Sequence, residues 1–245
     1  MKIFVISLKN SIERRERVIE SFSRMNLKFE FFDAIYGKDG LPEDLVNKPD
    51  DLHRRIFRSR PLSPGERGCF ASHYRLWEMC VKMGQPILIL EDDCIPTEFF
   101  SSVLSQLESL HSKGYEYLRV EPQDGAFTAI EVFQGMQIVL WHNNLSGTRG
   151  YSISVEGAKK LLRNSKKWHC AVDNFIGESY KTKLYGMGII PYMVLDPQDM
   201  MTTIQDPSGH VKVPIHFKLT RELFRFYRFS RRIIWNFSSI NKLKK

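Results

Sequence analysis

The chain lacks the features that mark several classes of protein. It has 4 cysteines among 245 residues, and they form neither a CxxC pair nor a spacing typical of metal ligands. No run of about 18 apolar residues occurs, which argues against a membrane-spanning helix. The apolar run at residues 1–7 is too short for a signal peptide. We therefore expect free, buried thiols rather than disulfides, and a reducing cytoplasmic setting.

Most of the chain also lacks an excess of positive charge. Its 36 Lys and Arg residues against 28 Asp and Glu give a formal net charge of +8. Residues 218–245 hold nine of these bases and a single acid, Glu222, so residues 1–217 carry 27 residues of each sign. A neutral body without an RNA-binding motif argues against nucleic-acid binding. The sequence predicts one domain, residues 1–217, and a basic tail, residues 218–245.

Apolar periodicity predicts alternating strands and helices. Strands are expected at residues 2–8, 27–35, 87–90, 115–121, 151–155 and 189–195, with a hairpin at 128–141. Helices are expected at residues 11–25, from Ser63, from Glu156 and at 173–181, and residues 37–62 are expected to form a long surface loop. This order predicts an α/β domain with a mixed central sheet flanked by helices.

Two helix starts carry capping signatures. Asn10 and Glu13 have the spacing of a capping box, and Ser11 is the alternative cap. The run Ser63–Glu66 (SPGE) combines a capping serine, a proline at the first helical position and a glutamate that completes the box. The second signature is the stronger one.

Three acids directly follow the apolar strand at residues 87–90. Glu91, Asp92 and Asp93 are costly to bury unless a positive group joins them. In open α/β sheets the carboxyl ends of strands are where ligands bind. Mg²⁺ or Mn²⁺ that bridges a diphosphate would satisfy these carboxylates. The alternative is a solvated acidic turn.

Several further segments accompany this acidic run. They are FVISLKNSIERRERV, FEFFDAIYG, LSPGERGCFASHYRLWE, ILILEDDC, YLRVE, GTRGYSISVEGAKKLL and AVDNFIG, within about residues 3–195. In this combination and order the chain resembles the bacterial lipooligosaccharide glycosyltransferases of family 25. The resemblance implies a GT-A fold with a Rossmann-type sheet, a UDP-sugar donor (most often UDP-galactose), Mn²⁺ or Mg²⁺, a lipooligosaccharide acceptor and inversion at the anomeric carbon.

The resemblance also implies roles for individual acids. Asp93, with Glu91 or Asp92, matches the metal-binding motif of the family. An inverting transfer needs a base for the acceptor hydroxyl, and Asp173 matches the family block that suggests this role. The alternative for Asp173 is an ordinary helix N-cap, and Glu121 is the second candidate for the base.

Residues at the strand ends and on the long helix are candidates for binding the nucleotide. They are Ser7, Leu8, Arg15, Asp33, Ala34, Ser72, His73 and Asp92. Arg15 would reach a phosphate, although a solvated helix face is an alternative for the nearby arginines. His73 lies in the block that resembles the family's Ser-His segment, and a packed core histidine is equally plausible.

Two further groups remain as candidates. The glycine-rich segment 147–151 resembles the part of the family that closes over donor or acceptor, whereas a simple turn is the alternative. His142, His210 and His216 could each complete a metal site, and no spacing singles one out.

The tail interleaves arginines with aromatic and aliphatic residues from Arg221 to Phe237. This composition predicts an amphipathic helix on an anionic membrane surface, on the inner face of the bacterial inner membrane. A helix packed on the core is the alternative. The competing functions are transfer from UDP-glucose or UDP-N-acetylglucosamine, metal-dependent nucleotidyl transfer or phosphate hydrolysis, and a nucleic-acid-binding module that uses the tail.

Overall fold

The chain folds around an eight-stranded mixed sheet with the order β2-β1-β3-β8-β5-β9-β7-β6. The computed structural model describes residues 1–197 and 214–244. The strands of this sheet are β1 (Lys2–Ser7), β2 (Glu30–Asp33), β3 (Ile87–Glu91), β5 (Tyr117–Arg119), β6 (Phe127–Phe133), β7 (Met136–Trp141), β8 (Gly150–Ile153) and β9 (Met187–Ile190). β1 runs parallel to both β2 and β3, whereas β8 is antiparallel between β3 and β5. The predicted mixed α/β sheet is thereby confirmed.

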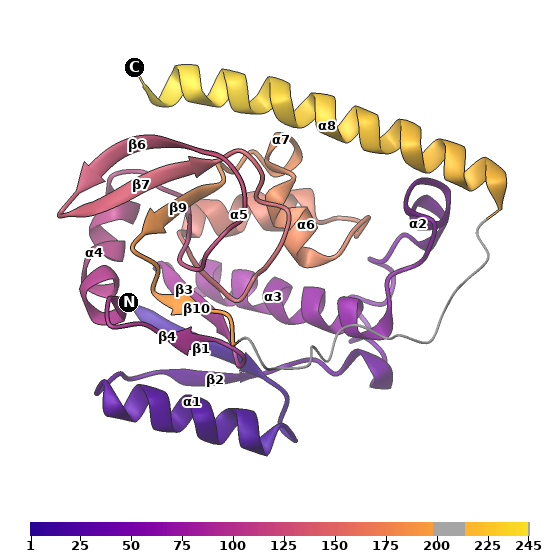
Figure 1. Ribbon diagram of the computed structural model, residues 1–245. Helices are drawn as coiled ribbons and strands as arrows, with labels where there is room; N and C mark the ends of the chain where they lie inside the picture. The colour runs from indigo at the N-terminus through magenta and orange to yellow at the C-terminus, as the bar shows by residue number, and fades with distance from the viewer. Residues whose placement is uncertain (198–213, 245) are drawn as a thin grey trace.

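Helices cover both faces of this sheet (Figure 1). The helices are α1 (Ile12–Arg24), α2 (Asp51–Arg58), α3 (Pro64–Met83), α4 (Phe100–Ser112), α5 (Val155–Asn164), α6 (Val172–Gly177), α7 (Ser179–Thr182) and α8 (Ile215–Leu243), with a 3₁₀ turn η1 (Gly37–Asp39). α3 and α5 pack on one face, and α1 and α4 pack on the other. A second, two-stranded sheet pairs β4 (Ile95–Pro96) with β10 (Val194–Leu195).

The central strand β3 is buried on both faces. Ile87 and Ile89 belong to the core under α3, whereas Leu88 and Leu90 belong to the core under α1 and α4. This arrangement explains why its sequence is an unbroken apolar run instead of an alternating one. The strand therefore delivers its acidic end, Glu91, to the edge of the sheet where β1 and β2 also end.

The predicted caps have different outcomes. In α3 the capping box forms, because Ser63 Oγ accepts from the Glu66 N–H at 3.1 Å and Glu66 Oε2 accepts from the Ser63 N–H at 2.7 Å. The box at Asn10 is wrong, since α1 starts after Ser11 without a side-chain cap. The turn after β1 is closed by a backbone hydrogen bond from the Ser11 N–H to the Leu8 carbonyl, which moves the helix start one residue along.

Two predicted elements differ from the structure, and one helix was not predicted. The expected loop at residues 37–62 contains η1 and α2, and the expected helix at 173–181 is divided into α6 and α7 at Glu178. The sequence interpretation did not include α4. α2 is eight residues long and packs against α8, with the rings of Phe57 and Phe224 5.0 Å apart. Its stability therefore depends on a partner more than 150 residues away, which local periodicity does not reveal.

The basic tail forms the long helix α8, which lies across α2 and α7 on the outside of the molecule (Figure 1). Thr220 Oγ1 donates to the Ile56 carbonyl at 2.5 Å, and Asn236 Nδ2 donates to the His142 carbonyl at 2.7 Å. The predicted helix is confirmed, and one of its sides packs on the body. Within residues 1–197 and 214–244, no helix combines the length and apolarity needed to cross a bilayer.

Candidate active site

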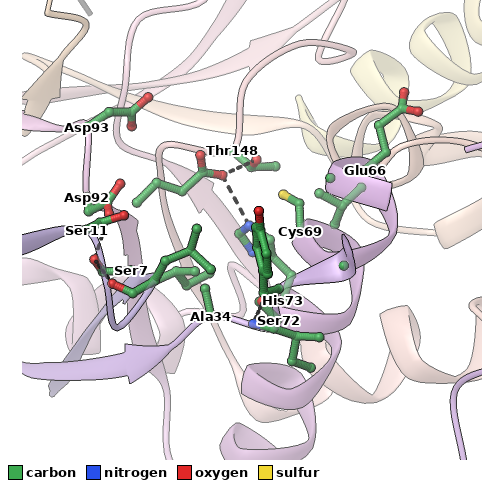
Figure 2. A pocket seen from close by; sticks show the side chains of 18 of the residues that line it. Ser7, Ser11, Ala34, Glu66, Cys69, Ser72, His73, Asp92, Asp93 and Thr148 are labelled. Carbon is green, nitrogen blue, oxygen red and sulfur yellow. Dashed lines mark hydrogen bonds and ion pairs between the residues drawn. The ribbon is translucent and has the colours of Figure 1, made fainter. Parts of the chain in front are cut away.

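A cavity of about 670 Å³ lies where β1, β2 and β3 end (Figure 2). Ser7 and Leu8 reach it from β1, and Ala34 reaches it from the end of β2. The first half of α3 forms the opposite wall, and the loops before β8 and α6 close the remaining sides. The cavity is large enough for a small-molecule substrate.

Two glycines let α3 approach this edge closely. A Cβ atom at Gly68 would lie 2.3 Å from the Ile35 carbonyl oxygen, and one at Gly37 would lie 1.8 Å from the Pro64 carbonyl oxygen. Ser72 secures the contact, because its Oγ accepts from the Ile35 N–H at 2.9 Å and donates to the Gly68 carbonyl at 2.8 Å. Ser72 therefore fixes the wall of the cavity through both of its hydrogen bonds.

Asp92 is held by two donors from the first βα unit. Ser7 Oγ donates to Asp92 Oδ2 at 2.7 Å, and Arg14 donates to Oδ1 at 3.0 Å. Both oxygens thus already accept a strong hydrogen bond. Asp92 ties the acidic turn to β1 and α1.

Glu91 ends a buried chain of hydrogen bonds. Trp77 Nε1 donates to the Tyr151 hydroxyl oxygen at 2.8 Å, and that hydroxyl lies 2.8 Å from His73 Nδ1. An ionised Glu91 can only accept, which favours the tautomer with the ring proton on Nε2 and with Nδ1 accepting the hydroxyl proton of Tyr151. His73 Nε2 then donates to Glu91 Oε1 at 3.2 Å.

This chain keeps Glu91 ionised. Thr148 Oγ1 also donates to Glu91 Oε1, at 2.5 Å. Burial disfavours the charge, yet the hydrogen bonds from His73 and Thr148 leave the pKa of Glu91 below its usual value. His73 is fully buried, as expected of a packed core histidine, and it also lines the cavity. Its role in binding a nucleotide stays a prediction.

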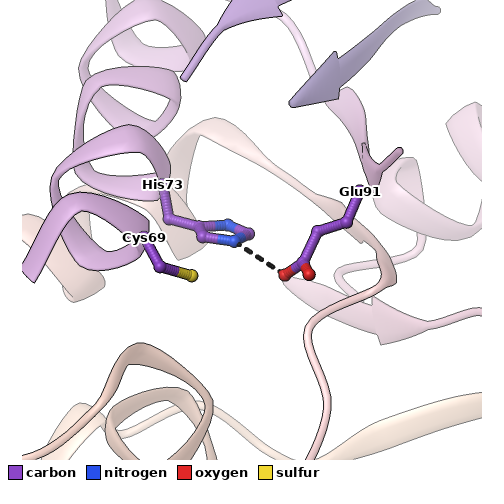
Figure 3. Close-up of side chains that lie close together, drawn as sticks. All are labelled: Cys69, His73 and Glu91. Atoms are coloured by element: carbon purple, nitrogen blue, oxygen red, sulfur yellow. Dashed lines mark hydrogen bonds and ion pairs between the residues drawn. The ribbon is translucent and has the colours of Figure 1, made fainter. Parts of the chain in front are cut away.

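Cys69, His73 and Glu91 form the one cluster of metal-binding side chains found among the described residues (Figure 3). Their ligand atoms lie within 4.8 Å of one another, with Cys69 one helical turn before His73. A thiol, an imidazole and a carboxylate suit a transition metal such as zinc. In the tautomer that donates to Glu91, however, Nε2 of His73 carries a proton and has no lone pair for a metal. Burial also raises the pKa of the Cys69 thiol well above its usual value.

Asp93 differs from its two neighbours. Its Oδ1 atom is buried and makes no hydrogen bond to the described residues, and it lies 3.3 Å from Arg149 Nε. Burial and the neighbouring Glu91 raise the pKa of Asp93 to about 6, although Arg149 opposes this shift. A carboxylate oxygen without a hydrogen bond, in a negative environment, suits a hard divalent cation.

The two candidates for the base lie in different environments. Asp173 lines the cavity from the start of α6, and burial raises its pKa above the usual value. It is not the helix cap, which is Ala171. Glu121 does not line the cavity and is 2% exposed. Burial raises the pKa of Glu121 to about 7, although ion pairs with Arg119 and Arg149 pull it down.

Arg15 and Asp33 lie beside the cavity without lining it. Arg15 donates to the carbonyls of Ser7 and Leu8 at 2.9 and 3.1 Å and to Asp33 Oδ1 at 2.6 Å. These contacts hold the ends of β1 and β2 together, so the guanidinium of Arg15 is already engaged by backbone and carboxylate oxygens.

Of the three candidate histidines, His142 is the one whose side chain the structure describes, and it does not join the acidic cluster. His142 follows β7, and its Nε2 lies 2.8 Å from Oγ1 of Thr128 on β6. It does not line the cavity. His210 and the side chain of His216 lie outside the described residues.

Sequence reasoning missed several residues of the cavity. Arg14 was grouped with the arginines of a solvated helix face. Its partner, Asp92, is 78 positions away in the chain, so the sequence does not reveal the pair. Cys69 and Thr148 meet Glu91 only through the packing of α3 and β8 against β3. Thr148 and Arg149 belong to the glycine-rich segment 147–151, which the sequence analysis named as a candidate only as a whole.

Comparisons with known proteins show the family of this chain. The family model described as "Glycosyltransferase family 25 (LPS biosynthesis protein)" matches residues 1–176. This chain belongs to glycosyltransferase family 25. The matched segment includes every cavity residue discussed above.

The relatives come from bacteria and animals. The lipooligosaccharide biosynthesis protein lic2B of Haemophilus influenzae is 34% identical over 169 residues, which cover 64% of this chain and 61% of that protein. A glycosyltransferase 25 family member of Aedes aegypti is 31% identical, with 65% of this chain and 27% of that protein covered. Procollagen galactosyltransferase 1 of Danio rerio is 30% identical, with 73% and 31% covered. The match thus spans under two thirds of each relative's length.

Among solved structures, a glycosyltransferase involved in the glycosylation of the major capsid of PBCV-1 aligns with 92% of this chain and 100% of that chain. The sequence identity is 12% and the TM-score is 0.41.

Proposed function

We propose that this member of family 25 transfers a hexose, galactose in the first instance, from a UDP-sugar to a sugar of a lipooligosaccharide acceptor. The observation that carries the proposal is the 670 Å³ cavity at the ends of β1, β2 and β3, with carboxylates on both sides. Galactose and the lipooligosaccharide are suggested by the names of the relatives, one a galactosyltransferase and one a lipooligosaccharide biosynthesis protein.

The proposed metal is Mn²⁺ or Mg²⁺, and Asp93 is its principal ligand. Glu91 and Asp92 each accept two hydrogen bonds from protein donors, whereas Asp93 Oδ1 accepts none from the described residues. When bound, such an ion neutralises the diphosphate and stabilises it as a leaving group. The GT-A fold inferred from the sequence belongs to this same proposal.

Asp173 is the proposed base, because it faces the cavity whereas Glu121 is buried between two arginines. The acceptor oxygen forms a bond to the anomeric carbon while the bond from that carbon to the diphosphate breaks. UDP leaves with the bonding electron pair, and the hydroxyl proton passes to Asp173. A pKa raised by burial makes Asp173 a better proton acceptor than an exposed aspartate.

Titration calorimetry with UDP, with UDP-galactose, UDP-glucose and UDP-N-acetylglucosamine, and with Mn²⁺ tests this function. We expect binding that requires the metal, and transfer or slow hydrolysis of one UDP-sugar. Asp173→Asn should bind the donor as the wild type does and lose transfer by about 10²–10⁴-fold, while Glu121→Gln keeps transfer if it folds. The reverse result would make Glu121 the base, and cleavage within the diphosphate would indicate nucleotidyl or phosphate chemistry.

We further propose that α8 binds an anionic membrane surface, which would place the enzyme on the inner face of the inner membrane. Eight apolar side chains of α8 are between 50% and 83% exposed, namely Ile215, Leu219, Leu223, Phe226, Phe229, Ile233, Ile234 and Phe237. Their spacing puts most of them on one side of the helix. Thr220, Phe224 and Arg228 contact the body from the other side.

The exposed bases of α8 favour a membrane surface of negative charge. Lys218, Arg225, Arg231 and Lys242 are exposed, and helical spacing places Lys218 and Arg225 next to the apolar side chains. Apolar side chains flanked by bases are the pattern of helices that lie in the headgroup region of anionic bilayers.

Point substitutions test membrane binding better than removal of the helix, because Ile240 and Leu243 pack against the core. Leu223→Glu with Phe226→Glu should reduce co-sedimentation with phosphatidylglycerol-containing vesicles by about tenfold or more, since each residue contributes roughly 1.5–3 kcal/mol when buried. The matched control is Val132→Glu, at a side chain 74% exposed on β6. Equal vesicle binding by all three proteins would contradict the proposal.

A further inference from the structure

Arg149 joins three acidic segments at the edge of the cavity. It lies in the loop between β7 and β8 and lines the cavity, with its side chain 19% exposed. Its Nε lies 3.3 Å from Asp93 Oδ1, one terminal nitrogen lies 3.2 Å from Glu121 Oε2, and the other lies 3.0 Å from Asp196 Oδ1. Each nitrogen of the guanidinium therefore faces a different carboxylate.

Charge is not balanced at this edge. The acids are Glu91, Asp92, Asp93, Glu121 and Asp196, and the arginines paired with them are Arg14, Arg119 and Arg149. Five acids thus face three arginines, so the acids outnumber their paired bases at this edge. Arg149 lies against Oδ1 of Asp93, the oxygen proposed above as a metal ligand, and its approach to Asp93 is the longest of its three contacts.

The guanidinium of Arg149 is also suited to bind the diphosphate of the proposed UDP-sugar donor. A guanidinium presents several N–H donors in one plane and binds phosphate oxygens through two of them at once. The same side chain that neutralises Asp93 thus borders the cavity where the proposed function places a diphosphate.

We propose that Arg149 exchanges partners during donor binding. In the donor-free protein it neutralises Asp93, and when a metal–diphosphate enters it leaves Asp93 and contacts the diphosphate oxygens. The inference rests on the proposed function, because it requires a metal and a nucleotide diphosphate. It adds a donor-binding residue whose effects on the two ligands have opposite signs.

The opposite signs separate this role from a purely structural one. Removing Arg149 removes a cation that competes for Asp93, so the metal alone should bind more tightly. The same change removes contacts to the diphosphate, so UDP should bind more weakly in the presence of the metal. A residue that only holds the loop in place would weaken both ligands together.

The experiment measures Mn²⁺ alone by the electron paramagnetic resonance signal of free Mn²⁺, and UDP with saturating Mn²⁺ by calorimetry. We expect Arg149→Met to bind Mn²⁺ several-fold more tightly and UDP about tenfold more weakly, since a charge-assisted hydrogen bond contributes roughly that factor or more. Arg149→Lys should bind Mn²⁺ as the wild type does and UDP more weakly. The control Arg75→Met removes an arginine that bridges Asp44 and Glu78 outside the cavity, and should change neither ligand.

Three results would overturn the exchange. If Arg149→Met binds Mn²⁺ and UDP with wild-type affinity, or binds both more weakly, Arg149 has only a structural role. The proposed function would still stand. If Arg149→Met does not fold, Arg149→Lys with unchanged UDP affinity would contradict the contact with the diphosphate. A wild-type protein that binds neither Mn²⁺ nor UDP would overturn the proposed function, and the exchange with it.

Discussion

Two clusters of acidic and basic side chains have opposite charge ratios. Glu178, between α6 and α7, is 1% exposed, and its oxygens lie 2.5 Å from Arg58, 2.7 Å from Arg228 and 2.6 Å from Lys181. The cluster at the end of β3 instead has more acids than bases and borders a cavity. In the first cluster cations outnumber the carboxylate, and in the second the carboxylates outnumber the cations.

The pKa values of Glu178 and Asp93 are shifted in opposite directions. Surrounding Glu178, the cations hold its pKa below the usual value although burial opposes the charge, so its ionised form stabilises the fold. At Asp93 burial and Glu91 raise the pKa instead, although Arg149 opposes the shift, so the ionised form of Asp93 costs stability. The first cluster joins α2, α7 and α8. The second borders the cavity, which suits the ligand-binding role proposed above.

The largest expected effect is at the cavity. Asp93→Ala should lower sugar transfer by about 10³-fold or more, because several kcal/mol of charge stabilisation on the leaving diphosphate would be lost. Metal-dependent UDP binding should be lost with it. Steady-state transfer assays and calorimetry measure both, and unchanged turnover would remove Asp93 from the metal site.

The next effect is on stability, in the other cluster. Glu178→Gln leaves three cations without their counter-charge, so the free energy of unfolding should fall by about 3 kcal/mol. The matched control is Glu222→Gln, which alters an exposed pair with Arg221 and Arg225 and should change stability by less than about 0.5 kcal/mol. Urea unfolding measures both, and equal losses would show that the burial of Glu178 does not matter.

This loss should depend on pH with a definite sign. Because the folded-state pKa of Glu178 is lowered, its contribution is fully present above the unfolded pKa of about 4.3 and disappears as pH falls through the lower folded value. The difference between wild type and Glu178→Gln should therefore be constant at neutral pH and shrink below about pH 4. A difference that grows on acidification would contradict the assignment.

The smallest expected effect has the opposite direction. Asp93→Asn removes a charge that lies near Glu91 and Asp92, so the metal-free protein should become more stable by about 1 kcal/mol. Thermal unfolding with a chelator present measures the change, and Mn²⁺ should stabilise the wild type while leaving the variant unchanged. A destabilised variant would mean that the ion pair with Arg149 outweighs the repulsion.

Parts of the fold could be predicted because their signals are local. The capping run at Ser63–Glu66, the apolar run of β3 and the hairpin of β6 and β7 depend on neighbours within a few residues, and all three predictions are confirmed. The helical tail is confirmed for the same reason. α2 was not predicted, because an eight-residue helix needs its contact with α8 to be stable.

For the site, the sequence by itself determined which acids follow β3 and that the chain resembles family 25. Only the tertiary structure decided how those acids differ. Glu91, Asp92 and Asp93 are consecutive in the chain, yet they face His73, Ser7 and Arg149, which come from three separate elements. The charge and hydrogen bonding of each carboxylate are set by these distant partners, and long-range packing alone brings such partners together.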